Sequence, residues 1–137
     1  MTTTVENLLA LWDVPPDTRA DPEADFAAVY TDPVRVNGTA LRLADMVDRA
    51  RELHAAFTGH EREVLEVVAA PGKLAVAFRL TADHTGPWTS AVGVLAPTGR
   101  RITATVIDVL TLDAAGRVSD IVMVADELGR LRQAGAL

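Results

Sequence analysis

One acidic residue interrupts an apolar stripe and is the leading candidate for chemistry. From Ile102 to Leu112 every second residue is apolar except Asp108. Alternation with period two is typical of a β-strand with one inward face, so Asp108 is predicted to be a buried carboxyl group. Burial raises a carboxyl pKa, and a raised carboxyl can act as general acid or base near neutral pH. The alternative is that the faces are reversed, or that Asp108 only accepts hydrogen bonds from nearby donors.

His84 is the candidate partner of this acid. It lies at the end of a strand predicted over residues 74–82, on the same side as Phe78. Because imidazole titrates near neutral pH, we expect His84 to assist Asp108 in moving a proton. The alternative is a turn histidine that bonds to the backbone near Gly86-Pro87.

Few aromatic side chains are available to contact a planar ligand, since Phe, Trp and Tyr make up only 4% of the chain. A buried tyrosine hydroxyl needs a partner, so Tyr30 is predicted to face a pocket as a donor. Trp88 follows a Gly-Pro turn and is expected at the pocket mouth. Ordinary core packing is the alternative for Phe57 and Phe78. The full predicted lining is Trp12, Tyr30, Phe57, Phe78, Trp88, Val106 and Met123.

The elements that must position these residues are helical in the first part of the chain. Apolar residues at helical spacing predict helices over residues 5–12, 21–30 and 44–57. Asp21-Pro22 is typical of a helix start. A short strand is expected at 34–36, before an Asn37-Gly38 turn.

The second part of the chain changes to strand patterning. Strands are predicted over residues 64–68, 74–82, 88–95, 102–112 and 118–125. Asp126 is predicted to be the N-cap of a last helix that reaches Leu131. Helices followed by strands indicate a single α+β domain over residues 1–137, rather than alternating β-α-β units.

The composition excludes several kinds of site. The chain has no cysteine, which rules out disulfides, iron–sulfur clusters, thiolate zinc sites and cysteine nucleophiles. Its three histidines are scattered without ligand spacing, so no metal is expected. Glycine-rich phosphate loops are absent as well.

Charge and hydropathy also limit the partners. The formal net charge is -6 and no basic cluster is present, so nucleic acid is not an expected partner. No apolar run approaches the roughly 18–20 residues that span a bilayer, so no membrane association is expected. The first residues lack the pattern of a signal peptide, and a cytoplasmic location is expected.

Several short segments together resemble the SnoaL-like polyketide cyclases, a family within the nuclear-transport-factor-2-like superfamily. They occur in the family's order from about residue 26 to the C-terminus. The segments are Tyr30-Thr31-Asp32-Pro33-Val34-Arg35-Val36-Asn37-Gly38, Leu53-His54-Ala55-Ala56-Phe57, Asp83-His84-Thr85-Gly86-Pro87, Pro97-Thr98-Gly99-Arg100, Gly116-Arg117-Val118 and Asp126-Glu127-Leu128-Gly129.

The resemblance implies both a fold and an activity. The fold is a curved antiparallel sheet wrapped by N-terminal helices, cone-shaped with a central apolar pocket. Family members often form homodimers or homotetramers through the sheet. The best-known members close a polyketide ring by an intramolecular aldol condensation, without metal or organic cofactor. Because the superfamily also hosts other reactions and binding proteins, the fold alone does not specify the chemistry.

The family's catalytic pattern is altered in this chain. The resemblance implies an acid/base aspartate on the last strand, just after a tryptophan, and a histidine on the preceding strand. With one extra residue allowed in the intervening turn, the aspartate position falls on Met123 and the tryptophan position on Val122. The histidine position falls on Asp108.

Three functions therefore stay open. The first is a cyclase or isomerase that acts on a hydrophobic polyketide-like small molecule with Asp108 and His84. The second is an epoxide hydrolase or epoxide-opening cyclase, which uses paired acids with an arginine between them. Arg79 is the only arginine predicted in mid-strand, and its side is opposite to that of His84. The third is a non-catalytic ligand-binding accessory protein, which Met123 in the aspartate position favours.

Overall fold

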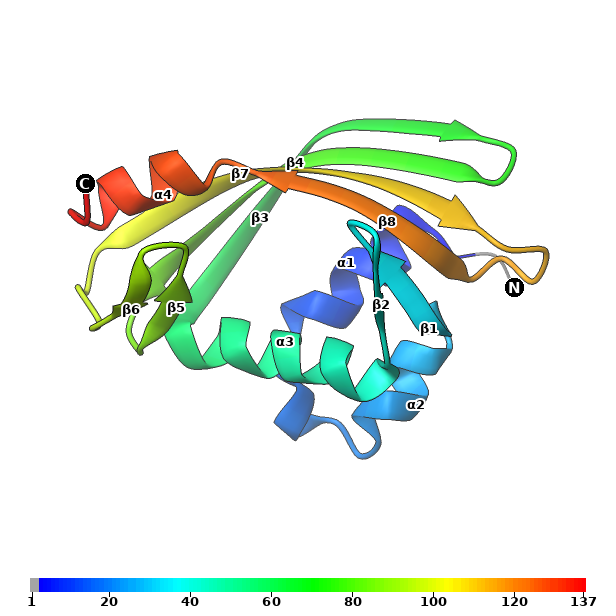
Figure 1. Cartoon of the computed structure of the whole chain (residues 1–137), viewed down its shortest axis with the longest axis horizontal. Helices are drawn as coiled ribbons and strands as arrows, with labels where there is room; N and C mark the ends of the chain where they lie inside the picture. The colour runs from blue at the N-terminus through cyan, green and yellow to red at the C-terminus, as the bar shows by residue number, and fades with distance from the viewer. Residues whose placement is uncertain (1–2) are drawn as a thin grey trace.

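The computed structural model, which describes residues 3–137, contains one curved six-stranded sheet (Figure 1). The strand order is β2-β1-β8-β7-β4-β3. The strands are β1 (Tyr30–Val36), β2 (Thr39–Leu41), β3 (Phe57–Ala70), β4 (Lys73–His84), β7 (Arg101–Leu112) and β8 (Val118–Ala125). Neighbouring strands are antiparallel, except that β1 runs parallel to β8.

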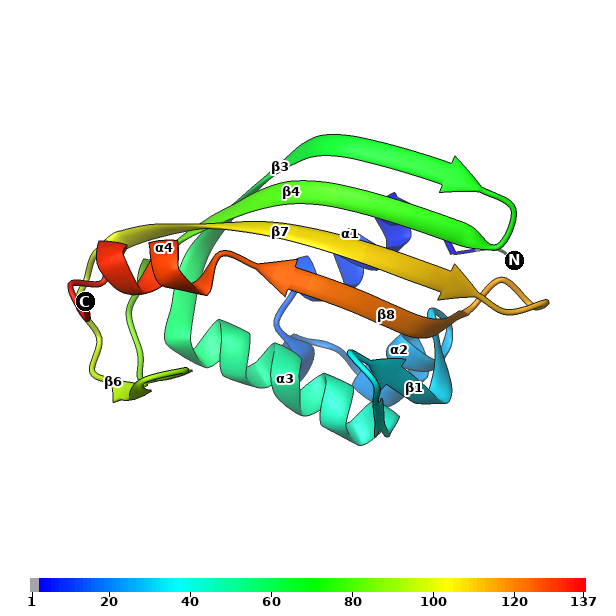
Figure 2. The same cartoon turned by 45° about the horizontal axis from the view of Figure 1, so that its top comes forward.

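Most of the helical segments lie on the concave side of this sheet (Figures 1 and 2). They are α1 (Val5–Asp13), the 3-10 turn η1 (Pro16–Thr18), α2 (Pro22–Ala27), α3 (Leu43–Ala56) and α4 (Glu127–Gln133). Helices α1, α2 and α3 lie under the arch of the sheet, whereas α4 follows β8 at one end of the molecule. The fold is thus the expected mixture of helices and a curved sheet.

Local sequence signals account for several element ends. The Asp21 carboxylate accepts the backbone N–H of Ala24 at the start of α2. Asp126 accepts the N–H of Gly129 at the start of α4, which confirms its predicted role as N-cap. Asn37 and Gly38 both have positive φ, 49° and 84°, and so connect β1 to β2 as predicted.

Several expected boundaries are wrong. Residues 88–95 form two short strands, β5 (Trp88–Ser90) and β6 (Gly93–Leu95), which make a separate hairpin. The break follows from a tight turn in which the Ser90 hydroxyl donates to the Gly93 carbonyl. Tyr30 begins β1 instead of ending α2. Strand β3 starts directly after α3, at Phe57, and is longer than the predicted 64–68.

The predicted inward stripe on β7 is confirmed. Val106 and Leu110 are 8% and 1% exposed, whereas Ile107 and Val109, which alternate with them, are 50% and 40% exposed. The buried side packs against the helices, and the other side is the outer face of the sheet. No helix within residues 3–137 has the length and apolar character that crossing a membrane requires.

Candidate active site

A cavity of about 270 Å³ opens between the concave face of the sheet and the helices. Six of the residues predicted for the site line it: Trp12, Tyr30, Phe78, Val106, Asp108 and Met123. The other lining residues are Leu8, Leu9, Val36, Met46, Arg49, Leu53, Arg62, Leu80, Leu110, Ile121, Ala125 and Arg130. Asp108 is therefore the only acidic residue in a lining that is otherwise mostly apolar.

Strand register surrounds Asp108 with apolar groups. Its neighbours across the sheet are Val76 on β4 and Met123 on β8, and its inward neighbours along β7 are Val106 and Leu110. Its Oδ1 atom is buried and has no hydrogen-bond partner. Burial raises the pKa of Asp108 from 3.8 to about 6, against the opposing effect of the Arg62 charge.

Arg62 is a cavity residue that the sequence analysis missed. Its side chain is only 10% exposed, and it donates two hydrogen bonds to Asp13 Oδ1 at 2.9 and 2.7 Å. The guanidinium carbon lies 4.6 Å from the centre of the Phe78 ring. A register shift in β3 between Thr58 and Glu61 reverses the alternation that starts at Phe57. A regular period-two pattern would therefore have placed Arg62 on the outer face.

Tyr30 and Trp12 form a hydrogen-bonded pair in the cavity wall. Trp12 Nε1 donates to the Tyr30 hydroxyl oxygen at 2.7 Å. Within residues 3–137, no acceptor is found for the hydroxyl's own proton. Burial, together with the nearby Asp108 charge, raises the pKa of Tyr30 above its ordinary value. Tyr30 is therefore a protonated phenol whose hydrogen is free to bind a ligand.

The expected pairing of His84 with Asp108 is wrong. Val76, the cross-strand neighbour of Asp108, lies eight residues before His84 on β4, which corresponds to about 26 Å at 3.3 Å per residue. His84 is fully buried instead among Phe57, Trp88 and Thr98. Its Nδ1 accepts the backbone N–H of Thr98 at 3.3 Å, and not a bond near Gly86-Pro87. His84 lies on the inward side of β4, as predicted, but it is too far along the strand to reach Asp108.

Phe57 and Trp88 lie outside the cavity, in a second depression of about 510 Å³ that we call the outer groove. The outer groove and the cavity share four lining residues, which define the mouth: Arg49, Leu53, Met123 and Arg130. Trp88 lines the outer groove and not the cavity, so its predicted place at the mouth stays a prediction. Phe57 and Trp88 pack edge to face with their ring centres 5.6 Å apart.

Comparison with known proteins identifies the family. The sequence profile of the SnoaL-like polyketide cyclases matches residues 8–134. The chain belongs to the SnoaL-like polyketide cyclase family. No curated protein sequence matches it.

Solved structures of the same fold include several SnoaL-like proteins. A protein described as a SnoaL-like polyketide cyclase from Jannaschia sp. CCS1 is 21% identical, with a TM-score of 0.76 over 97% of this chain and 92% of that chain. A SnoaL-like polyketide cyclase from Agrobacterium tumefaciens is 22% identical, with a TM-score of 0.69 over 97% and 98% of the two chains. AclR from Streptomyces galilaeus, described as a hydroxylase, is 20% identical, with a TM-score of 0.73 over 96% and 84%. At these identities the likeness shows the SnoaL-like fold alone.

In this SnoaL-like protein, several side chains in the cavity can bind or move a proton or bind an anion. They are the Asp108 carboxyl, the Tyr30 hydroxyl and the guanidinium groups of Arg49, Arg62 and Arg130. Among residues 3–137, no group of three or more histidine and acidic side chains is placed to hold a metal ion. The arrangement provides an acid/base, a hydrogen-bond donor and positive charge.

Proposed function

We propose that the protein is a cofactor-free cyclase or isomerase that acts on a hydrophobic, polyketide-like small molecule by acid/base catalysis. The observation that carries this proposal is the Asp108 carboxyl group. It is the only acid in an apolar cavity, its Oδ1 is buried without a partner, and its pKa is raised to about 6. Such a group is ionised at neutral pH and basic enough to remove a proton from carbon next to a carbonyl.

The proposed reaction needs only groups in the cavity. The Asp108 carboxylate removes a proton from the carbon next to a substrate ketone, while the Tyr30 O–H donates a hydrogen bond to the developing enolate oxygen. The enolate carbon attacks a second carbonyl of the same molecule, and this forms the ring bond. The Asp108 carboxylic acid then returns its proton to the new alkoxide. Trp12 Nε1, which bonds to the Tyr30 oxygen, orients that hydroxyl as a donor.

The register of β7 and β8 supports a role for Asp108 despite the altered family pattern. By the resemblance, the acid/base position falls on Met123, which is the direct cross-strand partner of Asp108. Both side chains line the same cavity. A carboxyl group on β7 instead of β8 can therefore still contact a ligand in the cavity. The proposed acid/base chemistry is unchanged, but its carboxyl group belongs to Asp108 on the neighbouring strand.

Hydrogen–deuterium exchange tests the proton-transfer step without the natural substrate. The probe is 1-tetralone, an apolar bicyclic ketone, in D₂O, with exchange at the carbon next to the carbonyl followed by NMR. We expect the wild-type protein to accelerate exchange above buffer, and Asp108→Asn to lower the enzymatic rate by about 10²–10⁴-fold. Glu66→Gln, which removes an exposed acid from β3, is the control and should keep the wild-type rate.

Two outcomes would contradict the enzyme proposal. Exchange by Asp108→Asn at the wild-type rate would remove Asp108 from the mechanism. Binding of 1-tetralone without any accelerated exchange by the wild-type protein would favour the non-catalytic ligand-binding accessory protein.

Arg62 favours a second candidate, an epoxide hydrolase or epoxide-opening cyclase. Its guanidinium is hydrogen-bonded to Asp13, lines the cavity with Asp108 and acts on the Asp108 carboxyl through its charge. If this chemistry operates, cyclohexene oxide should give the trans-diol, and both Asp13→Asn and Asp108→Asn should abolish it. Of these two acids the cyclase proposal requires only Asp108, so dependence on Asp13 distinguishes the two reactions.

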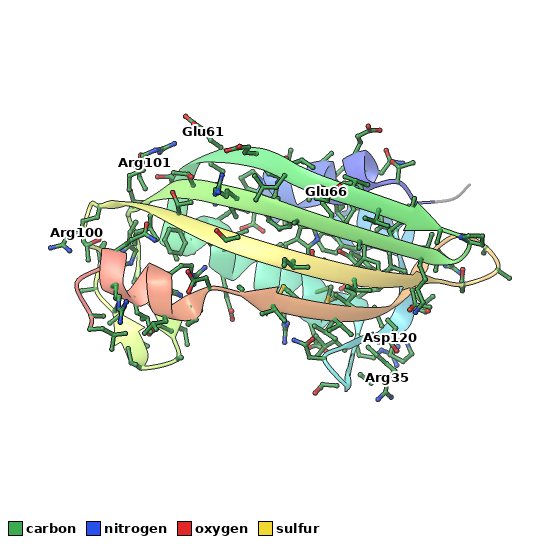
Figure 3. All side chains as sticks on the ribbon, turned by 90° about the horizontal axis from the view of Figure 1, so that it is seen from above. Arg35, Glu61, Glu66, Arg100, Arg101 and Asp120 are labelled. Carbon is green, nitrogen blue, oxygen red and sulfur yellow. The ribbon has the colours of Figure 1, made fainter. Side chains whose placement is uncertain are left out.

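We also propose that the protein is a homodimer or homotetramer assembled through the outer face of the sheet. Ile107 pairs with Val124 and Val109 with Val122 across β7 and β8, and these four side chains are 40% to 65% exposed. We call this set the outer apolar patch. Charged side chains such as Arg35, Asp120, Glu61 and Arg101 lie toward the margins of the sheet in Figure 3. An apolar centre with a charged rim is typical of a protein interface.

A further inference from the structure

Positive charge collects at the mouth of the cavity although the whole chain is acidic. The charged residues that line the cavity are Asp108 and three arginines, Arg49, Arg62 and Arg130. Two of these arginines, Arg49 and Arg130, also line the outer groove, where Glu52 is the only acid. The formal net charge of the chain is -6, so this local excess of cations runs against the overall balance.

The three arginines differ in how far their charges are already neutralised. Arg62 is held by two hydrogen bonds to Asp13 and so has a full counter-charge. The exposed Arg49 has no salt-bridge partner within residues 3–137. Arg130 lies 3.6 Å from Glu127, but its Nε is buried without any hydrogen-bond partner. At the mouth, Arg130 therefore keeps one unbonded donor in addition to its ion pair with Glu127, and Arg49 is without an ion pair among the described residues.

Arg130 is also held in place. Its guanidinium carbon lies 4.4 Å from the centre of the Trp88 ring and 5.6 Å from that of Phe57. Helix α4, which carries it, is tied to β7 because the Gln133 side chain bonds both the N–H and the C=O of Thr103, at 2.7 and 2.9 Å. Burial lowers the pKa of Arg130, although a guanidinium remains charged at any physiological pH. A fixed, partly dehydrated guanidinium is well suited to bind a carboxylate through two parallel bonds.

We propose that the mouth is an anion subsite, in which Arg130 and Arg49 bind a free carboxylate on the substrate while its apolar rings enter the cavity toward Asp108. This inference rests on the proposed function and adds the substrate class, an apolar polyketide-type acid and not a neutral ester or amide. Both arginines border the cavity and the outer groove, so a carboxylate held there leaves the far end of the ligand near the catalytic carboxyl group.

A pair of matched fluorescent probes tests the subsite independently of Asp108. Anthracene-2-carboxylate and anthracene-2-carboxamide have the same ring system and differ in charge at pH 7.5. In fluorescence titrations at low salt, we expect the carboxylate to bind the wild-type protein at least about tenfold more tightly. Arg130→Gln and Arg49→Gln should each remove most of that preference. The control, Arg132→Gln, removes the same charge from an exposed position on α4 and should keep it.

The possible results separate this inference from the proposed function. Equal binding of the two probes to the wild-type protein, or full preference in both mouth variants, overturns the anion subsite and leaves the acid/base proposal standing. Failure of both probes to bind overturns both, because the cavity would then not accept an apolar ring. Because Arg49 is exposed, Arg49→Gln gives a result even if Arg130→Gln does not fold.

Discussion

At the scale of single residues, the proposed chemistry depends on how Asp108 is solvated. Its cross-strand and same-strand neighbours are apolar, and Oδ1 has no donor to replace the water it loses. Burial therefore destabilises the charged form and raises the pKa of the carboxyl group. A general base needs such a raised pKa, because it is then ionised near neutral pH and still takes up a proton readily. Ionisation of Asp108 should therefore also lower the free energy of unfolding of the protein.

Stability should depend on pH through this group. The folded-state pKa of Asp108 is raised from 3.8 to about 6, so the folded state binds more protons than the unfolded state between these values. The free energy of unfolding then falls as pH rises through this window, by up to about 3 kcal/mol. Asp108→Asn should be more stable than wild type by about that amount at pH 7.5, with little difference at pH 4. Urea unfolding at both pH values measures this, and an unchanged difference between them would contradict it.

Tyr30 should act in the transition state more than in binding. Tyr30→Phe removes the hydroxyl that accepts from Trp12 and that we propose as the donor to the substrate. Loss of one such donor lowers turnover by about 10²–10³-fold, so we expect the maximal exchange rate of 1-tetralone to fall while the concentration for half-maximal rate changes little. A variant that loses only affinity would assign Tyr30 to binding instead.

At the scale of elements, β4 connects two different environments. Its Val76 end lies beside Asp108, and its other end buries His84 under Phe57 and Trp88. His84 also accepts the N–H of Thr98, which fastens the segment between β6 and β7 to the end of β4. His84 therefore helps to fix the position of Trp88, and the Trp88 ring in turn contacts the Arg130 guanidinium.

Substitution of His84 should therefore affect folding and not proton transfer. His84→Ala leaves a cavity in a fully buried cluster and should lower the free energy of unfolding by about 3 kcal/mol. The exchange rate of 1-tetralone per folded molecule should stay within about twofold of wild type. The milder His84→Gln keeps an acceptor for the Thr98 N–H and allows the rate to be measured if the alanine variant unfolds. A loss of rate as large as in Asp108→Asn would restore His84 to the catalytic site.

At the scale of the whole molecule, the curved sheet has two faces with separate uses. The concave face and the helices enclose the cavity. The outer apolar patch is exposed in the single chain and lies on the opposite face, away from α1, α2 and α3 (Figure 1). Because the patch lies on the side of β7 opposite to Asp108, two copies can pair there without closing the mouth.

A charge in the outer apolar patch should prevent assembly. Val124 is 65% exposed at the patch, and Val94, on the separate β6 strand, is 69% exposed. We expect Val124→Lys to shift the protein to a monomer and Val94→Lys to leave the oligomer intact, as judged by size-exclusion chromatography with light scattering. A wild-type protein that is already monomeric would contradict the proposed interface.

Local patterns were sufficient to predict the inward face of β7, the caps at Asp21 and Asp126, and the bounds of β8 at residues 118–125. Each depends on residues a few positions apart, where strand alternation and capping chemistry act. The partners of Asp108 were decided by tertiary structure. A register shift in β3 turns Arg62 inward, strand length carries His84 away, and the meeting of α3, α4 and β8 brings Arg49, Arg130 and Met123 to one mouth. Such contacts depend on register and on packing between distant segments, which no local period encodes.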